Sequence, residues 1–106
     1  MAQASAKPEL TLETVTASDE TLIRCSGKMT YTSAEALRSM VRPLFPETKR
    51  VVLDLKDMTY LDSFGLGVLV GCYLSARRHD CQLRLINVNP QPQQILQVTN
   101  VTYLIE

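Results

Sequence analysis

The amino-acid sequence predicts a single α/β domain in which helices pack on a mixed β-sheet, in the order β-β-α-β-α-β-α-β. Three observations lead to this prediction. Short runs rich in β-branched residues alternate with segments whose apolar residues recur at helical spacing. The 106 residues are enough for one domain with one core. Hydrophobic residues make up 45% and charged residues 21% of the chain, as in ordinary globular proteins.

The amino-terminal part predicts a short tail followed by a β-hairpin. Residues 1–8 contain one basic residue and no apolar core, so we expect a flexible tail rather than a signal peptide, with the domain covering residues 9–106. Residues 10–16 and 21–27 are rich in β-branched side chains and flank the polar segment 17–20. This is the pattern of an antiparallel hairpin.

A helix is predicted after Thr32, because Thr32 and Glu35 have the spacing of a capping box. Apolar side chains then recur every three or four residues and form one continuous face. Two prolines end or distort the last turn. The apolar face consists of Leu37, Met40, Val41 and Leu44, and the prolines are Pro43 and Pro46.

The middle of the chain predicts the central strand and the longest helix. Residues 51–55 are a continuous apolar run broken by one aspartate, the pattern of a strand covered on both faces. A loop over residues 56–61 should lead to Asp62 and Ser63, two good helix-capping residues. The helix that they begin is expected to end near Arg78.

The last third predicts a strand, a helix and a short edge strand. Residues 83–88 predict the first strand. Asn89, followed by two prolines, matches an N-cap with proline in the first helical turn, and this helix should stop near Asn100. Its glutamines, between positions 91 and 97, are expected on a solvated face. Residues 101–105 predict the edge strand.

Composition excludes several function classes. The 11 basic and 11 acidic residues give a formal net charge of zero at pH 7, which removes the electrostatic case for nucleic acid or an anionic membrane surface. The three cysteines form no CxxC pair, so we expect no disulfide framework or metal site, and a reducing cytoplasm fits best. The longest apolar stretch, residues 64–74, is well short of the ~20 residues that cross a bilayer. No cofactor is expected.

Glycine is distributed unevenly. Average usage of about 7% predicts roughly seven glycines, whereas the chain has 4, and Gly65, Gly67 and Gly71 lie in one segment. The segment does not match a phosphate-binding P-loop, because the chain contains no GxxxxGK motif. A dinucleotide fingerprint is incomplete, because Val70 stands at its third glycine position. A nucleotide-binding domain is therefore only weakly supported.

Ser63 is the candidate functional residue of this segment. A hydroxyl at a helix N-terminus lies beside free backbone amides and the positive end of the helix dipole, which favours a phosphate group on it. Gly65 and Gly67 would leave room for an incoming partner or kinase. A second interpretation stays open. Ser63 is then only a helix cap worth about 1 kcal/mol, and Gly67, Gly71 and Ser75 form a smooth ridge that packs on the sheet.

Catalysis is not expected. Asp54 and Asp62 lack a third ligand or a histidine nearby in sequence, so structural and capping roles suit them better than metal binding or acid–base chemistry. His79 is expected at a helix end, where its charge suits the dipole. No nucleophile–base pair is evident.

The string Asp-Ser-x-Gly-Leu-Gly-x-Leu at residues 62–69 follows Val-Val-Leu-Asp-Leu at 51–55 and precedes Leu-Ile-Asn-Val-Asn-Pro at 85–90. Together these segments resemble the STAS domain family, the bacterial anti-sigma factor antagonists, over nearly the whole chain. The resemblance implies a mixed sheet flanked by helices and a non-enzymatic role in partner switching. By this resemblance, the unmodified protein is expected to bind an anti-sigma factor that is also a serine kinase. Phosphorylation of Ser63 is then expected to dissociate the pair, and a serine phosphatase to reset it.

The resemblance also implies a partner-binding surface around the serine. Phe64 and Leu66 are candidate contacts at the helix start, with core packing the better alternative for Leu66. Relatives often carry an acidic pair where this chain has Lys28 and Thr30, and this change bears on partner choice because rim charges set recognition. A stressosome-type scaffold or transport-accessory subunit, with Ser63 only a cap, is the alternative. The expected partner-binding residues are Asp62, Phe64, Gly65, Leu66, Gly67, Lys28 and Thr30.

Overall fold

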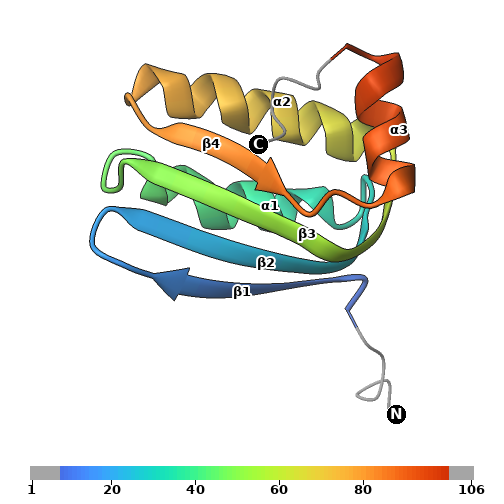
Figure 1. Ribbon diagram of the computed structural model, residues 1–106, viewed down its shortest axis with the longest axis horizontal. Helices are drawn as coiled ribbons and strands as arrows, with labels where there is room; N and C mark the ends of the chain where they lie inside the picture. Colours follow the sequence, from blue (N-terminus) through green and yellow to red (C-terminus); the bar gives the residue numbers. More distant parts are fainter. Residues whose placement is uncertain (1–7, 101–106) are drawn as a thin grey trace.

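The computed structural model describes residues 8–100, which form a four-stranded sheet and its helices (Figure 1). The predicted order is confirmed from the first strand to the last helix. The predicted edge strand 101–105 and most of the predicted tail lie outside the described residues. The elements are β1 Leu10–Thr16, β2 Glu20–Met29, α1 Ala34–Val41, a 3-10 turn η2 Arg42–Leu44, β3 Arg50–Leu61, α2 Ser63–Arg78, β4 Gln82–Ile86 and α3 Pro90–Val98.

The sheet is mixed, as predicted. Its strand order is β1-β2-β3-β4, with β1 antiparallel to β2 and with β2, β3 and β4 parallel to one another. The predicted hairpin is confirmed, and the amide of Ala17 closes its turn on the carbonyl of Glu20 at 2.8 Å. Met29 and Leu61, the last residues of β2 and β3, are register partners. They mark the carboxyl edge of the parallel strands, where α2 begins.

The hydrophobic core lies between one face of the sheet and the helices α1 and α2 (Figure 1). On β3 the buried residues Val51, Leu53 and Leu55 are two positions apart, so their side chains share this face. The predicted apolar face of α1 is confirmed, with Leu37 and Val41 fully buried against the core. Burying each side chain of this size contributes roughly 1.5–3 kcal/mol.

Segment 56–61, predicted as a loop, is the second half of β3, so that prediction is wrong. The segment continues the parallel pairing with β2. The register shifts twice, between Arg24 and Ser26 and between Gly27 and Lys28. Such bulges break the period-two pattern by which a strand is recognised in a sequence. Gly27 has φ +112°, which suits the second bulge because glycine has no Cβ to clash there.

The start of α1 differs from the predicted capping box. Ser33 is the N-cap, and it makes no side-chain cap hydrogen bond. Its hydroxyl accepts from the amide of Thr30 at 2.9 Å and donates to the carbonyl of Lys28 at 2.8 Å. The hydroxyl of Thr32 donates to a carboxylate oxygen of Glu9 at 2.6 Å. The capping-box prediction is wrong because Thr32 bonds a carboxylate far away in the sequence.

Two side-chain amides from the β4–α3 region fix the end of β3. Asn89, the predicted N-cap of α3, donates to the carbonyls of Lys56 at 2.7 Å and Met58 at 2.8 Å. Gln91 accepts from the amide of Leu61 at 2.8 Å and donates to its carbonyl at 3.1 Å, as a neighbouring strand would. The expected solvated position is wrong for Gln91. Its contacts hold Leu61, the last residue of β3, two positions before α2 begins.

Candidate functional site

Asp62 caps α2, and Ser63 is the first helical residue. Asp62 is extended, with φ −100° and ψ 179°, and its Oδ1 accepts from the amide of Gly65 at 2.7 Å. Its Oδ2 accepts from the amide of Tyr31 at 3.3 Å. The interpretation of Ser63 as a helix cap is therefore wrong, because Asp62 occupies that role. The side chain of Ser63 is exposed.

The backbone around Ser63 is held by hydrogen bonds, but two of its amide groups have no acceptor among the described residues. The amide of Asp62 donates to the carbonyl of Met29 at 3.1 Å, and the amide of Leu66 closes the first helical turn on Asp62 at 2.9 Å. Within residues 8–100, the amides of Ser63 and Phe64 donate to no other group. Open amides at a helix start carry the positive end of the dipole. A phosphate on Ser63 would therefore find donors and a favourable potential.

The three clustered glycines have different roles. A Cβ on Gly65 would lie 2.7 Å from the carbonyl oxygen of Met29 and 2.8 Å from Cδ1 of Leu61, so this glycine lets α2 pack against the strand ends. Gly67 and Gly71 are exposed, and a Cβ on either would meet nothing within 4 Å. The predicted packing of a Gly67–Gly71 ridge on the sheet is wrong. Gly67 lies four residues after Ser63, on the same helical face.

Two exposed aromatic rings adjoin Ser63. Phe64 is 45% exposed and meets Tyr31, which is 69% exposed, in an edge-on contact with ring centroids 6.3 Å apart. The position of Phe64 was predicted from the sequence, but Tyr31 was missed. Its only sequence signal is an aromatic residue in a polar segment next to a predicted helix start. Leu66 is 7% exposed and belongs to the core, so its side chain offers little to a partner.

Lys28 is the penultimate residue of β2, and Thr30 directly follows the strand, next to Tyr31. Lys28 is exposed and is the register partner of Tyr60 on β3. The hydroxyl of Thr30 donates to Glu9 at 2.8 Å, and the hydroxyl of Thr32 donates to the same oxygen. Hydrogen bonds from Thr32 and then Thr30 lower the pKa of the Glu9 carboxyl. Glu9, which sequence reasoning missed, therefore places a carboxylate against the hydroxyl of Thr30.

The remaining candidates have structural roles. Asp54 accepts from the amide of Lys56 and from the side chain of Asn87, both at 3.0 Å. His79 is the C-cap of α2, with Nδ1 3.0 Å from the carbonyl oxygen of Ser75. Among residues 8–100 no three His, Cys, Asp or Glu side chains gather as a metal site would require.

The cysteines are buried, unpaired thiols. Burial raises the pKa of Cys25 to about 12 and that of Cys72 to about 11. Both thiols are therefore protonated near neutral pH, which does not suit a nucleophile.

The fold and the site together define a class: a small mixed α/β domain that presents one serine hydroxyl at a helix start on the carboxyl edge of its sheet. The chain belongs to the STAS domain family, whose family model matches residues 11–106. It is 29% identical over 84 residues to the anti-sigma-B factor antagonist of Bacillus subtilis, covering 79% of this chain and 77% of that protein. It is 24% identical over 82 residues to the anti-sigma F factor antagonist of Paenibacillus polymyxa, covering 76% of this chain and 70% of that protein.

Solved structures have the same fold. An anti-sigma factor antagonist from Mycobacterium paratuberculosis superposes with a TM-score of 0.81 at 18% identity, over 94% of this chain and 86% of that one. The anti-sigma factor antagonist SpoIIAA in its unphosphorylated form superposes with a TM-score of 0.78 at 16% identity, over 92% of this chain and 85% of that one. None of the helices in the described part of the chain has the length and apolar character to span a membrane.

Proposed function

We propose that this protein is an anti-sigma factor antagonist that works by partner switching. Unphosphorylated, it binds an anti-sigma factor that is also a serine kinase, and phosphorylation of Ser63 releases it until a serine phosphatase restores the hydroxyl. The observation that carries the proposal is the exposed Ser63 side chain, which is free of any capping duty and lies beside two exposed aromatic rings. Its similarity to named antagonists supports the same role.

The proposed contact area, here called the Ser63 surface, combines apolar anchors with a polar rim. Tyr31 and Phe64 supply large, partly preorganised rings, the side-chain type that dominates the binding energy of protein interfaces. The bare Gly67 lets a partner approach the helix backbone beside the serine. Charges at the rim would select the partner and speed its association. The surface comprises Tyr31, Asp62, Ser63, Phe64 and Gly67, with Lys28, Thr30 and Glu9 at its rim.

Phosphorylation would reverse the electrostatics of this surface. A phosphate adds about −1.5 to −2 charges, next to the carboxylate of Asp62. In the free protein, the open amides of Ser63 and Phe64 and the dipole of α2 would stabilise this charge by about 0.3–1 kcal/mol. In a complex shaped for a hydroxyl, an unpaired dianion costs several kcal/mol. Binding is therefore lost while the fold survives, as a reversible switch requires.

The test begins with capture of the partner from native lysate by the wild-type chain. The captured kinase is then incubated with the chain and ATP, and the phosphorylated residue is located by mass spectrometry. We expect phosphate on Ser63 and loss of binding for Ser63→Asp. Ser18→Asp is the matched control, because Ser18 is exposed in the β1–β2 turn at the other end of the sheet. Phosphate at another residue, or equal binding by Ser63→Asp, would contradict the proposal.

The scaffold or transport-accessory alternative draws on Lys28 and Thr30, which stand where the family resemblance implies an acidic pair. This alternative assumed that Ser63 serves only as the helix cap, and that assumption fails because the cap is Asp62. A scaffold would capture other STAS proteins or a transporter in the same lysate experiment. It would keep them after the change Ser63→Asp.

A further inference from the structure

Two threonines flank Tyr31, and both are bonded to one carboxylate far away in the sequence. The hydroxyls of Thr30 and Thr32 donate to the same oxygen of Glu9, at 2.8 and 2.6 Å. The amide of Thr32 also donates to the hydroxyl oxygen of Thr30 at 3.3 Å. Glu9 therefore holds the residues on both sides of Tyr31, one of the two exposed rings of the Ser63 surface.

The backbone of Glu9 is fixed independently of its carboxylate. Its carbonyl accepts from the amide of Lys28 at 2.9 Å, one position beyond the terminal register pair of β1 and β2, Leu10 and Gly27. Gly27, at φ +112°, makes this approach possible, because a Cβ there would clash with the carbonyl oxygen of Glu9. A change confined to the side chain of Glu9 should therefore leave the strand pairing in place and remove only the contacts to the two threonines.

The Glu9 carboxylate is a strong acceptor for these two hydroxyls. Hydrogen bonds from Thr32 and then Thr30 lower its pKa, so the group is ionised near neutral pH. A hydrogen bond to an ionised acceptor is shorter and stronger than one between neutral groups. The side chain of Glu9 is exposed, so its position follows from these contacts and not from burial.

Tyr31 has few attachments of its own. Its amide lies 3.3 Å from Oδ2 of Asp62, which is longer than the roughly 3.0 Å typical of such bonds. Its ring is 69% exposed and meets the ring of Phe64 edge-on, with centroids 6.3 Å apart. The place of this ring on the surface therefore depends on the backbone that carries it, which the two bonded threonines hold on either side.

We propose that Glu9 is a positioning residue for partner binding, which holds Tyr31 against Phe64 before the partner arrives. A side chain that is already ordered in the free protein loses less conformational freedom on binding, so this preorganisation raises affinity without adding a contact. Loss of the ordering should weaken partner binding about threefold to tenfold, the range expected for immobilising one side chain. The inference rests on the proposed function of the Ser63 surface and adds a residue that acts on that surface from outside it.

The first measurement needs no partner. The NMR cross-relaxation peaks between the rings of Tyr31 and Phe64 are compared in the wild-type chain and in three variants. We expect weaker peaks in Glu9→Ala and recovery in Glu9→Gln, whose amide oxygen can accept from both hydroxyls. Glu13→Ala is the matched control, because Glu13 is an exposed carboxylate on β1 opposite Arg24 and should leave the peaks unchanged. Unchanged peaks in Glu9→Ala would overturn the proposal.

The second measurement is the dissociation constant of the captured kinase for the same variants, alone and combined with Tyr31→Ala. Glu9→Ala should weaken binding about threefold to tenfold, Glu9→Gln should recover most of this loss, and Glu13→Ala should stay within about twofold of the wild type. Combined with Tyr31→Ala, Glu9→Ala should cause no further loss, because no ring is left to position. A full further loss would show that Glu9 contacts the partner directly, which contradicts a positioning role.

The two measurements separate this proposal from the proposed function. If Ser63→Asp binds the kinase as the wild type does, the switching function fails, while the ring peaks still decide whether Glu9 positions Tyr31. If Ser63→Asp loses binding but Glu9→Ala keeps its ring peaks and its affinity, the switch stands and the positioning role is wrong. Circular dichroism of each variant confirms that it is folded.

Discussion

Asp62 and Ser63 are neighbours with separate tasks at the start of α2. Asp62 uses one carboxylate oxygen on the amide of Gly65 and the other on the amide of Tyr31, so it both closes the helix and fixes the adjoining loop. The hydroxyl of Ser63 makes no hydrogen bond within residues 8–100 and is exposed. The described fold therefore does not depend on a hydrogen bond from this hydroxyl.

This separation predicts unequal costs for two adjacent alanine substitutions. Asp62→Ala removes the cap and should lower the free energy of unfolding by about 0.5–2 kcal/mol. Ser63→Ala removes an unbonded exposed hydroxyl and should change it by less than about 0.5 kcal/mol. Urea denaturation of both variants measures the difference. An equal cost for Ser63→Ala would show that the hydroxyl stabilises the helix after all.

The glycines of α2 predict opposite effects of one added methyl group. Gly65→Ala places a Cβ 2.7 Å from the carbonyl oxygen of Met29 and should destabilise the fold by about 1–3 kcal/mol. Gly67→Ala meets open space in a helix and should stabilise it by about 0.5–1 kcal/mol. Thermal unfolding of the pair checks both signs. Similar shifts for the two variants would contradict the packing described for Gly65.

The sequence was sufficient to place Ser63 and Phe64 at the exposed start of α2, because their position follows from local helix signals. Tyr31 and Glu9 could not be placed in the same way. Tyr31 reaches Phe64 only because β2 and β3 end side by side, and Glu9 reaches Thr30 only because the segment before β1 lies against the end of β2. These contacts span more than 20 residues of sequence, and no local pattern encodes them.

The junction between β3 and α2 is held by a third element, α3. The side chain of Gln91 bonds both backbone groups of Leu61, at 2.8 and 3.1 Å, in place of a neighbouring strand. Leu61 directly precedes Asp62, so α3 helps to set the position at which Ser63 is presented. The position of the serine is thus a property of three elements and not of α2 alone.

Gln91→Ala should therefore loosen this junction. It leaves the amide and carbonyl of Leu61 without their partner, and we expect a loss of about 1–3 kcal/mol in the free energy of unfolding. Gln94→Ala is the control, because Gln94 is exposed on the same helix. Hydrogen exchange at the Leu61 amide should accelerate in the first variant only. Unchanged exchange would mean that Gln91 does not secure β3.

The helices were predictable because their signals are local, and the end of α2 at Arg78 is confirmed. The second half of β3 was not predictable, because two register shifts remove the alternation that marks a strand. Gln91 was misplaced for a related reason. An amide side chain on a helix looks solvated in the sequence, and only the tertiary arrangement shows the unpaired strand end that it satisfies.

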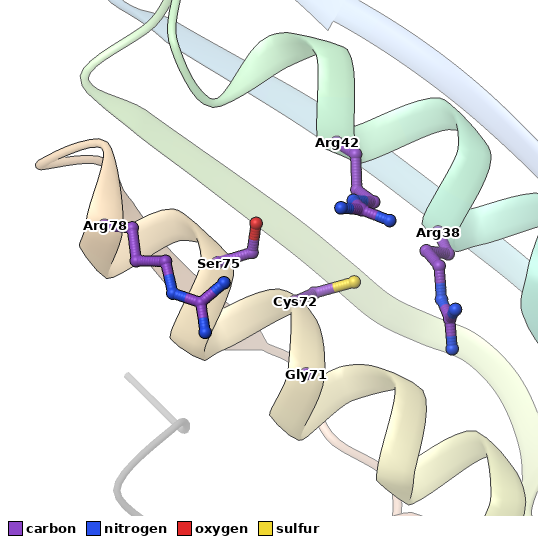
Figure 2. A pocket seen from close by; sticks show the side chains of 6 residues that line it. All are labelled: Arg38, Arg42, Gly71, Cys72, Ser75 and Arg78. Carbon is purple, nitrogen blue, oxygen red and sulfur yellow. The ribbon is translucent and has the colours of Figure 1, made fainter.

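At the scale of the whole molecule, one core supports the start of α2 and the Ser63 surface. The sheet and the helices α1 and α2 bury the thiols of Cys25 and Cys72. The balanced net charge predicted no nucleic-acid binding, but it could not reveal that Arg38, Arg42 and Arg78 line one pocket between α1 and α2 (Figure 2).

The buried thiols predict that the fold loses stability at alkaline pH. Their pKa values are about 12 for Cys25 and about 11 for Cys72 in the folded state, against 9.0 for an ordinary thiol, so above about pH 9 the unfolded chain binds fewer protons than the folded one. The contribution of the protonated thiols to the free energy of unfolding is fully present below about pH 9. It falls as the pH rises toward the folded pKa values, by up to about 1.4 kcal/mol per pH unit for each thiol. Urea denaturation between pH 8 and 11, compared with Cys25→Ala, measures this slope. An equal slope in the variant would contradict the assignment.

The central claim is that a negative charge at Ser63 switches partner binding off while the fold persists. The direct measurement is the dissociation constant of the captured kinase for wild-type protein before and after stoichiometric phosphorylation of Ser63. We predict at least about a hundredfold weaker binding after phosphorylation, corresponding to roughly 3 kcal/mol, with an unchanged circular dichroism spectrum. Equal affinity of the two forms would contradict the account.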